Sequence, residues 1–164
     1  VEHKPRRGYY VKKLTLAEMK DIFAIREVVE GVAVREVTEK ATPEQIKELS
    51  NYFKKFADDW NKELKNEYLL ADRKFHDRLI EIAGNDILKD VNEMFNIYRF
   101  SYQKGLMRDP DETLSEHLAI IEKIEEGDAW NAQILMMKHM EKSRQNMEKA
   151  FAENVHGDGT IDWT

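Results

Sequence analysis

Residues 69–85 read LLADRKFHDRLIEIAGN and combine a helical hydrophobic repeat with two residues of a candidate site. Its apolar residues recur every three or four positions, which predicts a helix with one face in a core; they are Leu69, Leu70, Phe75, Leu79, Ile80, Ile82 and Ala83. Gly84 is suited to a left-handed helix end, and Asn85 to the start of the next helix. Asp72 and His76 lie one turn apart beside the apolar stripe, so both should face inward. Because burying such groups without a partner is costly, the stretch also predicts a site.

The composition of the chain predicts an all-α bundle. A length of 164 residues fits one domain that buries about 70% of the unfolded chain's surface. With only seven Gly and three Pro, and abundant helix formers, little of the chain is suited to turns or strands. The absence of cysteine leaves His, Asp and Glu as the side chains that could hold a metal.

Charge and hydropathy exclude several classes of protein. With a net charge of −6, the chain is not expected to bind DNA strongly by itself, because DNA binding requires a basic surface. No apolar run approaches the roughly 20 residues of a membrane span, and the N-terminus lacks a secretion signal. We therefore expect a cytoplasmic protein that is not inserted in a membrane.

Helix-start signals divide the chain. Thr15 and Thr42 each begin a capping box, and Asp109-Pro110-Asp111 interrupts a long periodic region. We expect a helical domain over residues 15–155, preceded by a strand and linker at 1–14 and followed by a flexible tail at 156–164. The expected helices cover about 16–40, 43–64, 66–83, 86–107, 113–126 and 128–153.

Arginines accompany the apolar faces of the first and fourth expected helices. The apolar face of the first comprises Ile22, Ile25, Val29, Val32, Ala33 and Val37. Arg26 lies beside this face, where an arginine is commonly solvated with its aliphatic part along the apolar surface. Arg99 lies among the aromatic residues of the fourth helix.

Three of the five histidines, His76, His117 and His139, lie in apolar helical contexts, and Asp72 joins them. A lone buried histidine is usually a satisfied core residue. Three imidazoles and one carboxylate suit zinc, nickel, iron or manganese, and facing helices of bundles build such sites. His3 and His156 lie in the flanking segments and receive no role.

Two other classes of function remain open. His76-Asp77 is the dipeptide that names the HD phosphohydrolases, which are also helical, although Asp77 should turn away from the face of His76. No H-E-x-x-H motif or pair of Glu-x-x-His segments is present. The chain could also be a purely structural dimerisation bundle, in which the histidines are core residues.

The motifs together resemble the FCD domain, the effector-binding half of FadR-type GntR transcription regulators. Asp72-x-x-Phe75-His76-x-x-Leu79 is followed by Gly84-Asn85, Glu116-His117, Gly127-Asp128 and His139, and Arg26-x-x-x-Glu30 is near the family's R-x-x-[LVI]-E pattern. The resemblance implies an antiparallel six-helix bundle with a central cavity, which dimerises. It also implies a divalent metal, with zinc the first choice, on Asp72, His76, His117 and His139.

The same resemblance gives the N-terminal residues a meaning. Residues 7–11, RGYYV, are similar to the strand that closes the wing of the winged-helix domain in these regulators, so DNA would be bound only through a preceding domain. A small carboxylate effector is expected beside the metal, contacting Arg26 or Arg99. The implied function is regulation of DNA binding by that effector, without catalysis.

Overall fold

The computed structural model describes residues 2–4, 8–10, 15–99 and 108–154, and it confirms the all-α prediction. Within these residues, six α-helices form the domain: α1 (Leu16–Lys40), α2 (Pro43–Asp59), α3 (Lys65–Ala83), α4 (Asp86–Arg99), α5 (Pro110–Glu125) and α6 (Ala129–Asn154). A short 3₁₀ helix, Lys62–Leu64, precedes α3. Strands β1 (Glu2–Lys4) and β2 (Gly8–Tyr10) pair in an antiparallel manner, within the segment 1–14 where one strand and a linker were expected.

Capping explains most of the helix boundaries. Thr15 and Thr42 each accept a hydrogen bond from the backbone N–H of the third residue of the following helix, and the Glu18 or Gln45 side chain accepts one from the backbone N–H of the cap residue. Gly84 ends α3 with φ = 67°, a left-handed conformation that glycine adopts without a steric penalty. The expected capping signals are thus confirmed.

Two boundaries differ from the prediction. α2 ends at Asp59 instead of near residue 64, because Trp60 has an extended backbone and Asn61 caps the 3₁₀ helix. α5 begins at Pro110, three residues early, because Asp109 is its N-cap and proline is well suited to the first helical position. The predicted part of the fourth helix beyond residue 99, the linker at 11–14 and the tail at 156–164 lie outside the described residues.

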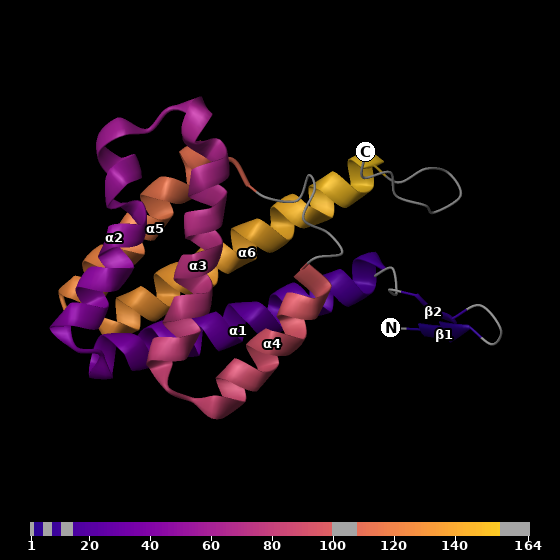
Figure 1. Ribbon diagram of the computed structural model, residues 1–164, viewed down its shortest axis with the longest axis horizontal. Coiled ribbons are helices and arrows are strands. Elements are labelled where there is room, and N and C mark those ends of the chain that lie inside the picture. Colours follow the sequence, from indigo (N-terminus) through magenta and orange to yellow (C-terminus); the bar gives the residue numbers. More distant parts are fainter. Residues whose placement is uncertain (1, 5–7, 11–14, 100–107, 155–164) are drawn as a thin grey trace.

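The two longest helices, α1 and α6, lie side by side along the length of the domain (Figure 1). They run antiparallel, since Lys20 pairs with Glu148 while Gly31 lies against Met137. α2, α3 and α5 pack together at one end of this pair, and α4 contacts both α1 and α3. The inner face of α1 therefore packs against α3, α5 and α6, and these three helices meet in the interior.

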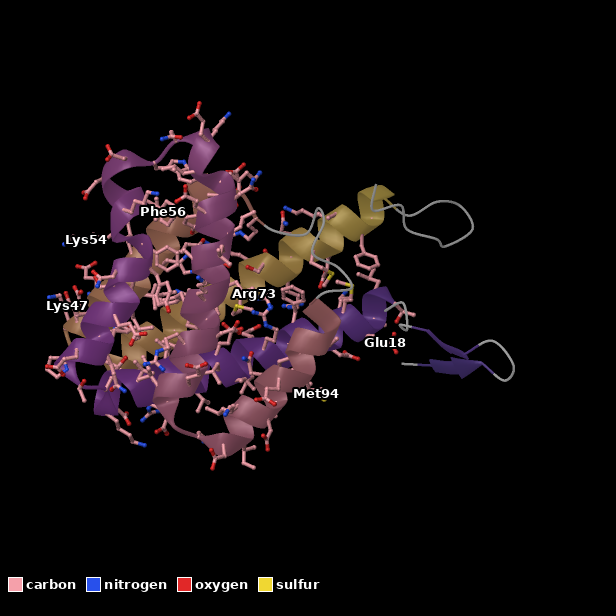
Figure 2. All side chains as sticks on the ribbon, in the orientation of Figure 1. Glu18, Lys47, Lys54, Phe56, Arg73 and Met94 are labelled. Carbon is pink, nitrogen blue, oxygen red and sulfur yellow. The ribbon has the colours of Figure 1, made fainter. Side chains whose placement is uncertain are left out.

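The core is apolar and rich in aromatic rings. Phe53, Tyr68 and Phe75 are completely or almost completely buried, and Phe56 lies within the cluster formed by α2, α3 and α5 (Figure 2). Two apolar residues predicted to be inside are exposed instead: Ile25 is 48% exposed and Leu70 54%. Among the described residues, no helix is both long and apolar enough to cross a bilayer.

Candidate metal centre

The four predicted ligands meet in the interior. Asp72 and His76 come from α3, His117 from α5 and His139 from α6, and one ligand atom of each lies within 4.8 Å of the others. His117 Nε2 lies 3.2 Å from Asp72 Oδ1 and 3.3 Å from His76 Nε2, and the separation of His76 Nε2 and Asp72 Oδ1 is 3.9 Å. All three histidines are at least 95% buried. Residues up to 67 positions apart in sequence, from Asp72 to His139, thus form one cluster of donors.

Carboxylates bind the outward-facing nitrogens of two of these histidines. Glu30 on α1 accepts a hydrogen bond from His76 Nδ1, and Glu116 on α5 accepts one of 2.8 Å from His139 Nδ1. A carboxylate that is ionised can only accept, so the Nδ1 atoms of His76 and His139 carry protons. The Nε2 atom of each ring is consequently left to face the cluster with a free lone pair when the ring is neutral.

A chain of hydroxyl groups sets the orientation of the third histidine. Tyr68 Oη lies 2.9 Å from both His117 Nδ1 and Thr113 Oγ1, and Thr113 Oγ1 donates to the Asp109 carbonyl at 3.4 Å. Since a carbonyl only accepts, Thr113 donates to it, Tyr68 donates to Thr113, and His117 Nδ1 donates to Tyr68. The Phe53 ring stacks on His117 at 4.3 Å and 9° and holds the imidazole in this plane. His117 therefore also presents its Nε2 lone pair to the cluster.

These donors fit a divalent transition metal. Around a tetrahedral zinc ion with bonds of about 2.0–2.1 Å, donor atoms lie about 3.3 Å apart, close to the shortest separations in the cluster. Metal-binding histidines almost always donate their other ring N–H to a carboxylate or another acceptor, as all three do here. Two facing Nε2 lone pairs, at 3.3 Å, cannot hydrogen-bond to each other and require a proton or a cation between them. The four residues could therefore hold a divalent metal ion.

The surroundings give the three histidines different affinities for protons. Burial, with the neighbouring His139 and His76, holds the pKa of His117 well below its ordinary value. Burial also lowers the pKa of His139, against the opposing effect of its hydrogen bond to Glu116. For His76 burial acts in the same direction, but the charge and hydrogen bond of Glu30 outweigh it and raise the pKa. Two rings are thus neutral at pH 7, as ligands must be, and in the metal-free chain His76 is the ring that binds a proton most readily.

Glu116 stays ionised although it is largely buried. Burial by itself would raise the pKa of this carboxyl group, but hydrogen bonds from His139, Arg108 and Lys142 hold the pKa well below its usual range. The guanidinium of Arg108 binds both Glu116 oxygens, at 2.6 and 2.9 Å, and Lys142 binds one at 2.7 Å. The negative charge beside His139 is thus compensated by two cations.

The position of Arg26 differs from the expectation of a solvated side chain. Arg26 is 8% exposed, and its Nε and one terminal nitrogen donate to Glu30 Oε1 at 3.0 and 2.7 Å. A solvated position was expected because no partner was assigned to Arg26, whereas Glu30, one turn later on α1, binds the guanidinium and the centroid of the Phe23 ring lies 5.5 Å from it. Arg26 therefore reaches the donor cluster indirectly, through Glu30 and His76. The side chain of Arg99, the other predicted effector contact, lies outside the described residues.

Asp77 lies apart from the cluster, as its helical position predicted. It accepts a hydrogen bond from Asn92 at 3.4 Å and lies 3.8 Å from Arg73, whose side chain is labelled in Figure 2. The acid of the His76-Asp77 dipeptide is therefore not a member of the donor set.

Sequence reasoning missed the outer partners of the histidines. Glu30 and Glu116 were part of recognised motifs without an assigned role, and Tyr68 lies one turn before Asp72 on the same face of α3, a spacing that could have indicated it. Thr113 shares a helix face with His117 by the same rule. Glu30 and His76 are 46 positions apart in sequence, so no local pattern indicates their contact.

Comparison with known proteins identifies the family. The model of the FCD domain matches residues 21–142, which is most of the chain and includes all four candidate ligands. The chain belongs to the FCD domain family, as the motifs indicated. It is 22% identical over 157 residues to the HTH-type transcriptional repressor RspR of Escherichia coli K12, covering 94% of this chain and 69% of that protein. It is also 24% identical to the HTH-type regulator YdhC of Bacillus subtilis, covering 90% and 68%.

Proposed function

We propose that this chain is the ligand-sensing domain of an HTH-type transcription regulator and that it binds a divalent transition metal through Asp72, His76, His117 and His139. The observation that carries the proposal is the convergence of three histidine Nε2 atoms and one carboxylate, with every Nδ1 atom already engaged. Membership in the FCD family and the similarity to HTH-type regulators support the regulatory role. Zinc is the first candidate, followed by nickel, manganese and iron.

The proposed effector is a small carboxylate that binds beside the metal. A divalent ion held by four protein groups supplies a Lewis-acidic position for a carboxylate oxygen when it keeps a further coordination position open. The chain supplies Arg26 next to the site, held by Glu30, and Arg99 near the end of α4. Two arginines and a cation suit an anionic ligand and disfavour a cationic one.

Regulation would follow from differential binding. A carboxylate that prefers one arrangement of the bundle shifts the equilibrium toward that arrangement, and a typical coupling of about 1–3 kcal/mol changes the affinity for DNA several-fold to a hundredfold. We assign strand β2 to the end of a preceding winged-helix domain, on the basis of its RGYYV segment, so that this strand and the linker would transmit the change. Such a DNA-linked sensor acts in the cytoplasm. A carboxylate that binds the domain but leaves operator binding by the longer regulator unchanged would refute this mechanism.

The first experiment measures metal by elemental analysis of untagged protein after incubation with Zn²⁺ and desalting. We expect about one ion per chain for the unchanged protein, and loss of that ion from His117→Ala and from His139→Ala. His3→Ala and His156→Ala are the matched controls, because positions 3 and 156 fall outside the range 15–155 that the sequence predicts for the helical domain, and both variants should retain the ion.

The outcome separates the proposal from its two alternatives. A chain that takes up no Zn²⁺, Ni²⁺ or Mn²⁺, and whose stability does not change with a chelator, would be a structural bundle with core histidines. Metal-loaded protein that hydrolyses phosphoesters would instead be a phosphohydrolase. The position of Asp77 outside the donor cluster disfavours this second alternative. If metal binds, thermal-shift screening of carboxylic acids with loaded and metal-free protein identifies the class of effector.

We also propose that the chain forms a homodimer through an apolar surface on α1 and α4. Ile25 and Val28 on α1 are about half exposed, and Ile87 and Met94 are exposed on the neighbouring α4, where Met94 lies on the outer side of the helix (Figure 2). Exposed apolar residues on adjoining helices are typical of a surface that another protein covers. Light scattering of Val28→Glu should give a monomer, whereas Trp130→Ser, which changes an exposed apolar residue near the start of α6, should leave the dimer intact. A monomeric unchanged chain would refute the dimer.

A further inference from the structure

Glu116 occupies an unusual place next to the candidate metal centre. Its Oε2 atom accepts hydrogen bonds from His139 Nδ1 and Arg108, and its Oε1 atom accepts from Arg108 and Lys142. Arg108 precedes α5, whereas His139 and Lys142 are one turn apart on α6. The carboxylate therefore joins the start of α5 to the ligand-bearing part of α6, with both of its oxygens in use.

The cations that hold Glu116 fix its geometry. Arg108 binds the two oxygens with two of its nitrogens, the bidentate arrangement that restricts the plane of a carboxylate. Only 6% of the Arg108 side chain is exposed, so solvent screens this pair less than it screens an ion pair on the surface. A carboxylate held in this way presents the same oxygen to His139 Nδ1 whether or not an ion is bound to Nε2.

We propose that Glu116 is a positioning residue for the metal site: it keeps the His139 proton on Nδ1 and thereby leaves the Nε2 lone pair available to the ion. This inference deepens the proposed function and rests on its metal site. An imidazole without an acceptor at Nδ1 can place its proton on Nε2, where the proton occupies the lone pair that a metal needs. Loss of an outer partner of this kind typically lowers metal affinity 10–100-fold.

Glu112 provides a matched control. It lies one turn before Glu116 on α5 and also accepts hydrogen bonds from Arg108, at 3.2 and 3.3 Å. Its side chain is 64% exposed, and among the described contacts it binds no histidine. Glu112→Gln and Glu116→Gln therefore remove the same charge from partners of the same arginine, but only Glu116→Gln changes the acceptor of His139.

The test uses two measurements on the unchanged protein, Glu116→Gln and Glu112→Gln. The Zn²⁺ dissociation constant, from competition with a chromophoric chelator, should rise 10–100-fold in Glu116→Gln and less than twofold in Glu112→Gln. Long-range ¹H–¹⁵N spectra of metal-free, ¹⁵N-histidine protein should show His139 with its proton on Nδ1 in the unchanged protein and in Glu112→Gln. Glu116→Gln should show a mixture of tautomers. Unchanged helical circular dichroism verifies that each variant is folded.

Failure of the inference is distinguishable from failure of the proposed function. The positioning role alone is overturned if Glu116→Gln binds Zn²⁺ with the same affinity as the unchanged protein, or if the His139 proton stays on Nδ1 in this variant. An unchanged chain that binds no Zn²⁺ overturns the metal site itself, and with it the role of Glu116 in metal binding. Should Glu116→Gln fail to fold, Arg108→Lys, which retains the charge but not the bidentate geometry, is expected to weaken Zn²⁺ binding by a smaller factor, and unchanged affinity in it overturns the inference.

Discussion

Replacing Arg26 with alanine should destabilise the domain even in the absence of any effector. Arg26 donates two hydrogen bonds to Glu30, and the pair is buried, since Arg26 is 8% exposed and Glu30 1%. Its guanidinium carbon also lies 5.5 Å from the centroid of the Phe23 ring. Arg26→Ala removes the positive charge that pairs with Glu30, so the buried Glu30 carboxylate keeps only part of its hydrogen bonds and neutralising charge.

The expected cost follows from the burial of the pair. Removing one partner of a buried ion pair costs about 3–5 kcal/mol. Because His76 still donates to Glu30, we expect a loss near the lower limit, about 3 kcal/mol. Arg35→Ala is the matched control: Arg35 and Glu39 form a pair of the same spacing on the same helix, also at 3.0 Å, but they are 49% and 42% exposed. An exposed helical pair of this type contributes about 0.3–0.5 kcal/mol.

Urea unfolding of the metal-free protein, followed by circular dichroism, measures both variants, and equal m-values verify that the unfolding transitions are comparable. In a chain of this length, 3 kcal/mol corresponds to a decrease in Tm of roughly 6–12 °C. If Arg26→Ala is no less stable than Arg35→Ala, the guanidinium does not stabilise Glu30 in solution. Arg26 would then be a solvated residue, as its position beside the apolar face first suggested, and the reasoning from burial would be refuted.

Two further substitutions test the packing of the core and the hydroxyl chain. A Cβ atom at Gly31 would lie 2.7 Å from Met137 Cγ, so Gly31→Ala should lower the unfolding free energy by about 1–2 kcal/mol. Combining it with Met137→Ala should cost less than the sum of the two single changes, and additive costs would show that α1 and α6 pack less closely. Burial raises the pKa of Tyr68 above its usual value of 10.0. Stability from this group is complete below pH 10 and is lost as pH rises, by up to about 1.4 kcal/mol per pH unit. Tyr68→Phe should therefore show a shallower loss of stability above pH 10 in urea unfolding, and equal slopes would contradict a buried neutral hydroxyl.

The parts of the fold that could be predicted are those with a local cause. The capping boxes at Thr15 and Thr42 and the glycine at position 84 act within one turn of helix, and the structure has the helix ends at these residues. The inward direction of Asp72 and His76 also follows from the periodicity of a single helix. Spacing could thus identify the four donors as candidates, although it could not show that they meet.

The parts that could not be predicted depend on contacts between helices. Arg26 borders the apolar face of α1, and its burial depends on how α1 packs against the rest of the domain. Ile25 and Leu70 belong to apolar stripes but lie at their edges, where the angle between helices decides which residue is covered. The early end of α2 likewise coincides with a tertiary contact, the hydrogen bond from the Trp60 indole to Asp111. Periodicity gives the direction of a face but not its width.

The outer partners also bear on whether these histidines are ordinary core residues. A core histidine is satisfied when each ring nitrogen has a complementary partner, one as donor and the other as acceptor. Here the three Nδ1 atoms all donate outward, to Glu30, Tyr68 and Glu116, so the three Nε2 atoms must all be satisfied from the interior. The interior group that faces them is the Asp72 carboxylate, which can only accept when ionised and therefore cannot donate to any of them. A proton on His76, the ring with the raised pKa, would relieve the repulsion between two of the lone pairs. It would leave a third neutral ring without a donor among the four groups, whereas the proposed metal ion would accept a lone pair from each of the three rings and from Asp72.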